Sequence, residues 1–184
     1  MRNGRILLTL AVAAAAARIP FAWQYPNPDI SLFSVVGHRL LQGDALYTDV
    51  FDIKPPLTFL LYALSEALVG QGAGQIILLG AAASISAMAG CYALAREIEP
   101  RAGLVAAFLW LLFSVDVTLE AQHPNGELLA NAALVWAVVF VVRSRAAPAG
   151  LLFAAATLVK QNTIAVPFVL ALLLVGRREW RAPA

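Results

Sequence analysis

The chain has 184 residues, of which 61% are hydrophobic and 13% are charged, and its mean hydropathy is +0.77. A soluble domain is about half apolar and a quarter charged, so this composition excludes an ordinary soluble domain and a disordered chain. The one cysteine excludes a disulfide scaffold, and 13 basic against 11 acidic residues (net charge +2) do not indicate a nucleic-acid partner. The composition indicates a helical membrane protein with several spans.

The first apolar stretch, residues 6–23, follows a basic head that contains Arg2 and Arg5. It is long enough for one membrane-spanning helix, which needs about 17–25 apolar residues. A cleaved signal peptide has the same order of basic head and apolar run, but Arg18 and Pro20 interrupt any clean cleavage region. We therefore expect a span, with Arg18 near its outer end reaching outward to water.

A polar stretch, residues 24–54, comes next. Within it, apolar residues at helical spacing between residues 30 and 41 predict a short amphipathic helix that ends at Gln42-Gly43-Asp44. Two prolines after Lys54 then open the apolar run 57–69, which at about 1.5 Å per residue is only about 20 Å long. This length is short for a full crossing, so we expect an external helix that lies at the membrane surface.

Later in the chain, three apolar stretches are clear candidates for spans and a fourth is interrupted. They are residues 74–95, 102–117, 128–142 and 149–176, the last broken by Lys160-Gln161-Asn162-Thr163. Together with the first stretch they predict an all-α, polytopic bundle of about 5–6 spans. The sequence shows no repeat and no soluble linker, so residues 1–184 are expected to form a single transmembrane domain.

Arginine clusters at the ends of the apolar stretches predict the topology. The clusters are Arg2/Arg5, Arg96/Arg101, Arg143/Arg145 and Arg177/Arg178/Arg181. By the positive-inside rule they face the cytoplasm, which leaves residues 24–72 and 118–126 outside and puts a turn near Lys160 outside too. The outer face then collects Asp29, His38, Arg39, Lys54, Glu120, His123, Glu127 and Lys160. Ionisable groups at a membrane are costly, so by default they indicate function.

Asp29 and Lys54 each allow a structural and a functional interpretation. Asp29 comes just before the amphipathic helix, where it can cap the helix N terminus and can also be a catalytic carboxylate held at a rigid helix start. Lys54 directly precedes Pro55-Pro56, which fix the angle at which the chain enters the next run. It is either a lysine that reaches to the interface or a cation for a lipid-linked phosphate.

Glu127 opens the apolar stretch that follows the second external segment. It is either a first-turn acid favoured by the helix dipole or a second carboxylate that faces Asp29 across an outer cavity. In the second interpretation it binds the acceptor or a divalent metal ion, together with Glu120 and His123, although their spacing matches no strict metal motif. Lys160 needs water or a partner, because an isolated lysine in an apolar region costs several kcal/mol.

Three strings, in order along the chain, resemble the GT-C integral-membrane glycosyltransferases. The nearest branch is that of protein O-mannosyltransferases and aminoarabinose transferases, the glycosyltransferase family 39 type. The stretch 37–57 is similar to the first external loop of these enzymes, and Pro124-Asn125-Gly126-Glu127 falls at their second external acidic residue. The stretch 155–161, which contains Thr157 and Lys160, resembles their threonine-lysine string.

The resemblance implies the transfer of a sugar from a polyprenyl-phosphate donor to a hydroxyl of a lipid, glycan or protein acceptor, usually with inversion. It implies a long first external loop with juxtamembrane helices, Asp29 as the catalytic base and Lys54 as a ligand of the donor phosphate. We add Lys160 and Arg39 as further cations for that phosphate. The expected place is a prokaryotic inner membrane with the active face outward, and the expected chain is the N-terminal part of a longer enzyme.

Two departures leave the donor sugar and the metal requirement open. Ile53 stands where the aminoarabinose branch has an acid, and Ser31-Leu32-Phe33 stands where an arginine is expected. Two other functional classes also stay open. A transporter fragment predicts inverted repeats and broken helices, of which only the break at Lys160 is seen. A non-catalytic scaffold or truncated pseudo-enzyme predicts that substitutions at Asp29 and Lys54 affect stability alone.

Overall fold

The computed structural model describes residues 2–23, 27–118 and 120–179. These residues form eight α-helices and two short 3₁₀ helices, with no strand among them. The elements are α1 (Arg2–Ala16), η1 (Ile19–Trp23), α2 (Pro28–Leu41), α3 (Pro56–Val69), α4 (Ala73–Ile98), α5 (Ala102–Phe113), α6 (Gly126–Val142), α7 (Ala146–Val159), η2 (Gln161–Ile164) and α8 (Ala165–Glu179). The prediction of an all-α fold is confirmed for the described residues.

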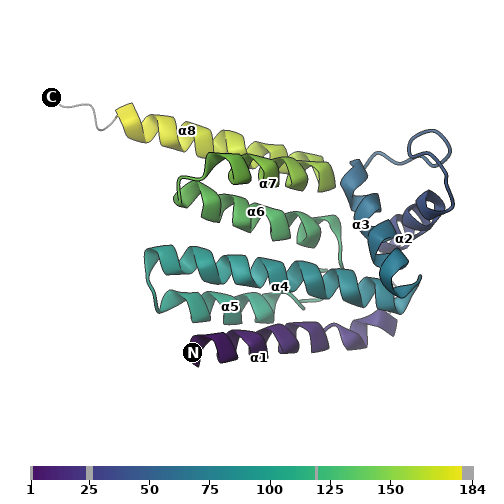
Figure 1. Ribbon diagram of the computed structural model, residues 1–184, viewed down its shortest axis with the longest axis horizontal. Coiled ribbons are helices and arrows are strands. Elements are labelled where there is room, and N and C mark those ends of the chain that lie inside the picture. Colours follow the sequence, from purple (N-terminus) through teal and green to yellow (C-terminus); the bar gives the residue numbers. More distant parts are fainter. Residues whose placement is uncertain (1, 24–26, 119, 180–184) are drawn as a thin grey trace.

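Most of the helices run along one common direction, and α2 and α3 pack together across one end of them (Figure 1). Helix α4 lies at the centre, where it contacts α1, α5 and α6, and α6 in turn contacts α7. Glycines allow these close approaches: a Cβ at Gly90 of α4 would lie 2.5 Å from Val135 of α6. Small residues at such contacts are typical of helices that pack within membranes.

Prolines set several of the helix boundaries. Helix α1 ends at Ala16, four residues before Pro20, whose ring would clash with the Ala16 carbonyl and which has no N–H to donate. Pro28 and Pro56 occupy the first positions of α2 and α3, where a missing N–H costs nothing. The two helices predicted between residues 30 and 41 and between 57 and 69 are thereby found with nearly the expected bounds.

Two segments of the described chain are long and apolar enough to cross a membrane, Asn3–Phe21 and Ala73–Ile98. They agree with two of the predicted spans. The other apolar helical segments have 10–17 residues. The predicted stretch 102–117 yields a helix of only 12 residues, because the chain leaves the helix at Ser114. A bundle of 5–6 spans is therefore not established by helix length.

The two ends of the helical layer differ in the side chains that they carry. The α4–α5 and α6–α7 turns lie at the end where α1 begins, whereas α2, α3 and the start of α6 lie at the opposite end (Figure 1). The first end carries the arginines of the two turns, namely Arg96, Arg101, Arg143 and Arg145. The second end carries Asp29, Lys54, Glu127 and Lys160. Residues 24–26 and Arg181 lie outside the described residues.

Arg18 is buried, with 2% of its surface exposed, so the prediction that it reaches outward to water is wrong. Its guanidinium donates hydrogen bonds to the carbonyl oxygens of Ala14 at 3.0 Å, Ser114 at 2.9 Å and Ala121 at 3.4 Å. These acceptors satisfy most of the guanidinium donors away from water, which permits the burial. Arg18 thus ties the end of α1 to the loop that leads from α5 to α6.

The α2–α3 pair is held by aromatic packing. Phe33 of α2 meets Phe59 and Tyr62 of α3 in edge-to-face contacts, with ring centroids 5.8 and 5.7 Å apart. Gly37 lets the two backbones approach, since a Cβ there would lie 2.8 Å from the backbone nitrogen of Ala63. This packing fixes the start of α2, one turn before Phe33, against the neighbouring helices.

Candidate active site

The Asp29 and Glu127 carboxylates lie in the first turns of two helices, α2 and α6. Asn27 caps α2 by accepting a hydrogen bond from the Asp29 backbone N–H at 2.9 Å, and Asn125 caps α6 by accepting one from the Leu128 N–H at 2.8 Å. The interpretation of Asp29 as the cap is therefore wrong, because Asp29 is the second residue of α2. Glu127 lies in the first turn of α6, as expected.

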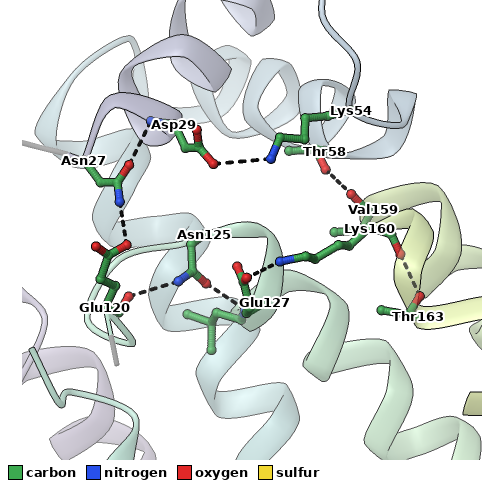
Figure 2. Close-up of polar contacts among 11 residues, drawn as sticks. Asn27, Asp29, Lys54, Thr58, Glu120, Asn125, Glu127, Val159, Lys160 and Thr163 are labelled. Atoms are coloured by element: carbon green, nitrogen blue, oxygen red, sulfur yellow. Dashed lines mark hydrogen bonds and ion pairs between the residues drawn. The ribbon is translucent and has the colours of Figure 1, made fainter. Parts of the chain in front are cut away.

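The two capping residues also join the start of α2 to the loop before α6, as Figure 2 shows. The Asn27 amide donates to the Glu120 carboxylate at 2.5 Å, and the Asn125 amide donates to the Glu120 carbonyl at 3.1 Å. The Tyr62 hydroxyl donates to the Pro124 carbonyl at 2.9 Å. These contacts hold the loop before α6 against α2 and α3.

Each of the two carboxylates is paired with a lysine (Figure 2). Lys54 Nζ lies 3.4 Å from Asp29 Oδ2, and Lys160 Nζ pairs with Glu127 Oε1. Lys160 ends α7, and α7 is fastened to α3 by the Thr58 hydroxyl, which donates to the carbonyl of Val159 at 2.7 Å. Lys160 therefore has the partner that its place in an apolar region required.

The four paired side chains line one small cavity, together with Phe33, Thr58, Gly126 and Val159. Its volume is about 20 Å³, which is room for about one water molecule. The Asp29 side chain is 54% exposed and that of Glu127 is 59% exposed, so both ion pairs are open to water. The cavity as it stands has no room for a larger ligand between the two ion pairs.

A second cavity, of about 260 Å³, borders Glu127 on another side. Its walls combine apolar side chains of α5 and α6, among them Trp110, Phe113 and Leu128, with the amides of Asn125 and Asn131. Glu127 lines both cavities. Glu127 therefore lies between the small charged cavity and the larger, mostly apolar cavity.

Glu127 lies just before the apolar stretch 128–142, and its pKa is set by opposing effects. Burial raises the pKa of its carboxyl. The hydrogen bond from Lys160 and one from the backbone N–H of Glu127 itself lower this pKa. The charges of Lys160 and Lys54 add to the lowering, so the net pKa lies below the ordinary value. Glu127 is therefore ionised at neutral pH and keeps its negative charge beside Lys160.

Arg39 is not brought to the small cavity. It lies near the C-terminal end of α2, about 15 Å along the helix axis from Asp29, and it pairs with Asp44. His38, one residue earlier, contacts Glu66 of α3, with 2.5 Å between Nδ1 and Oε1. Both side chains make their contacts away from the Asp29 carboxylate.

His123 is buried, with 5% of its surface exposed. Burial lowers its pKa, and the charge of Glu120 opposes that effect only partly. In the part of the chain that the structure describes, no three His, Cys, Asp or Glu side chains come together so that they could hold a metal ion. Glu120, His123 and Glu127 therefore do not meet there as one metal-binding group.

Sequence reasoning overlooked the residues that hold the site together, chiefly Asn27, Thr58, Tyr62 and Asn125. Part of the signal was present, since Asn27-Pro28 is a capping residue followed by proline at the first helical position. Asn125-Gly126-Glu127 has the same order of cap and first-turn acid. Thr58 and Tyr62 give no such local signal, because their partners are distant in sequence.

Residues 53–184 match the family model described as dolichyl-phosphate-mannose-protein mannosyltransferase. The match covers well over half of the chain. The chain belongs to this family. No curated protein and no solved structure matches the chain.

Membership confirms the resemblance to GT-C enzymes and, with it, the class of membrane glycosyltransferase. The matched part of the mannosyltransferase family model includes Lys54, Glu127 and Lys160. Asp29 precedes the match, so its connection to the family part of the chain is structural, through Lys54 and the shared cavity.

Proposed function

We propose that the chain transfers a sugar from a polyprenyl-phosphate donor to an acceptor hydroxyl at the outer face of a membrane. The observation that carries this proposal is the small cavity in which Asp29, Lys54, Glu127 and Lys160 meet from four separate segments. The family description names dolichyl-phosphate-mannose as donor and a protein as acceptor. A mannose-like donor is therefore the first one to test, with lipid, glycan and protein acceptors.

The membrane arrangement that we propose is a single domain of about 5–6 spans. The arginine-bearing turns face the cytoplasm, and the α2–α3 pair lies at the outer surface. Helices shorter than the hydrocarbon core cross by thinning the bilayer or through flanking residues that reach to its surface. A prokaryotic inner membrane fits this arrangement, with the cavity at the outer face where a lipid-linked sugar presents its head group.

Asp29 is the proposed general base. The acceptor hydroxyl gives its proton to the Asp29 carboxylate while its oxygen forms a bond to the anomeric carbon of the sugar. The bond from that carbon to the phosphate oxygen breaks, and its electron pair leaves with the polyprenyl phosphate. A positioned base contributes about 10²–10⁴-fold to such a step.

The two lysines are the proposed binders of the leaving phosphate. Negative charge builds on the phosphate oxygen as the bond breaks, and a fixed cation stabilises it most in a site with little water. Lys54 lies next to Asp29, so the base and the leaving group share one cation. Lys160 brings a second positive charge to the same cavity. Glu127 is the proposed residue that orients the acceptor.

The larger cavity beside Glu127 is the proposed place for the first apolar unit of the lipid. Trp110, Phe113 and Leu128 supply an apolar wall next to the charged cavity. A lipid phosphate bound by Lys160 would have its chain emerge toward the helices α5 and α6. Because the lipid chain would leave hydrocarbon and not water, packing contacts with these side chains, and not the hydrophobic effect, would hold it there.

The test is a transfer assay with the full protein in proteoliposomes and radiolabelled polyprenyl-phosphate mannose. Lys54→Gln should lower transfer about 10- to 100-fold, which is the effect of losing one hydrogen bond to a charged group. Arg39→Gln is the matched control, because it removes the same charge from the same external segment but outside the cavity. Equal transfer by the two variants would contradict the role of Lys54, and no transfer by the wild-type protein would favour a scaffold.

A further inference from the structure

A third cavity lies at the opposite end of the helical layer, far from the proposed active site. It has a volume of about 520 Å³ and lies between the C-terminal parts of α4 and α6. Its polar lining comes from Tyr92, Arg96 and Glu97 of α4 and from Trp136 and Arg143 at the end of α6. Arg143 follows Glu127 by about 24 Å along α6, so the two sites are separate.

The cavity carries an excess of positive charge. Arg143 is paired with Glu97 at 2.8 Å, which joins α6 to α4. Arg96 instead lies over the ring of Tyr92, 5.4 Å from its centroid, with Nη1 3.4 Å from the Tyr92 hydroxyl. Two arginines and one glutamate give the lining a charge of +1, which complements the single negative charge of a phosphodiester.

Helix α5 packs closely against two side chains that line the cavity, Arg96 and Tyr92. A Cβ on Gly103 of α5 would lie 2.6 Å from Cγ of Arg96 and 2.9 Å from the Tyr92 ring, so α5 presses directly on both side chains. On the other wall, the Trp136 indole donates to the Ser86 carbonyl at 3.0 Å. The stem of Arg96 is therefore packed against α5, while the residue as a whole stays exposed, so its guanidinium is accessible at the cavity.

We propose that this cavity binds the phosphate of an anionic ligand, and that in the membrane this ligand is an anionic phospholipid. Guanidinium groups bind phosphate with paired hydrogen bonds, and basic pockets between helices at the cytoplasmic side bind anionic head groups. Tyr92, one turn before Arg96, is an aromatic residue of the kind that lies at head-group depth, whereas Trp136 lies near the middle of α6. The lipid source rests on the membrane orientation proposed above, but the phosphate site does not rest on sugar transfer.

The test is native mass spectrometry of the full protein in detergent with phosphatidylglycerol and, in parallel, phosphatidylcholine. The wild-type protein should retain phosphatidylglycerol in preference. Arg96→Gln and Arg143→Gln should each weaken that binding about fivefold, the effect of one basic side chain near an anionic lipid surface. Glu97→Gln should tighten it, because Arg143 loses its carboxylate partner and becomes free for phosphate.

Arg145→Gln is the matched control, because Arg145 lies in the same turn, is exposed, and does not line the cavity. It should bind phosphatidylglycerol as the wild type does. Competition with inorganic phosphate separates the two sources: displacement shows a site that also takes the free anion, and persistence shows a site that needs the lipid. Equal retention of the two lipids, or unchanged binding by all three cavity variants, would overturn the proposal. Neither result would bear on sugar transfer.

Discussion

Replacing Arg18 by methionine should release the loop between α5 and α6 from the first helix. Arg18 donates two hydrogen bonds of ordinary length, to Ala14 and Ser114, and a longer one to Ala121. A hydrogen bond from a charged group contributes about 1.5–3 kcal/mol, so losing two costs about 3–6 kcal/mol. Methionine carries no charge, so the variant avoids the cost of burying the guanidinium, and this offsets several kcal/mol of the lost hydrogen-bond energy. We expect a net loss of about 2 kcal/mol.

A loss of this size should lower the melting temperature by about 4–8 °C, at about 2–4 °C per kcal/mol for a chain of this length. The measurement is thermal unfolding of the full protein in detergent. Arg5→Met is the matched control, since Arg5 is exposed and lies in α1, the helix that ends two residues before Arg18. It should change the free energy of unfolding by less than about 0.5 kcal/mol. Equal melting temperatures for the two variants would refute the assignment of Arg18 as the tie.

Two further predictions concern the support of the site. Burial lowers the pKa of His123 below its unfolded value of about 6.5, so its contribution to stability is complete above that pH and falls as the pH drops. His123→Gln should therefore flatten the loss of thermal stability between pH 7.5 and 5.5, and an unaltered pH profile would count against the burial. Gly37→Ala should destabilise the α2–α3 pair by about 1–3 kcal/mol, because its Cβ would lie 2.8 Å from backbone, whereas Gly4→Ala meets nothing within 4 Å and should be neutral or stabilising. A Gly37→Ala protein as stable as Gly4→Ala would show that the two helices separate easily.

Local signals predicted most of the helix boundaries. Pro55-Pro56 act on the residues next to them, so the start of α3 was predicted, whereas the first span was expected to run to residue 23 and α1 ends at Ala16 because of Pro20. The break at Lys160 was equally local, and α7 ends at Val159. Glu127 was recognised as a first-turn acid for the same reason.

The partners of the charged residues could not be predicted in the same way. Arg18 is buried because its acceptors, Ser114 and Ala121, come from a loop about a hundred residues later. The contact of Asn27 with Glu120 joins segments 93 residues apart. Such pairings depend on how whole helices pack, which residue spacing does not specify.

The most direct test of Asp29 as the general base is a single-turnover measurement with Asp29→Asn in the full protein preloaded with polyprenyl-phosphate mannose. Asparagine keeps the size of the side chain but does not accept the acceptor proton. We expect the variant to bind the donor as the wild type does and to transfer the sugar about 10²–10⁴-fold more slowly. Asp44→Asn, in the same external loop, should transfer at the wild-type rate. Wild-type turnover by Asp29→Asn would contradict the assignment of Asp29 as the general base.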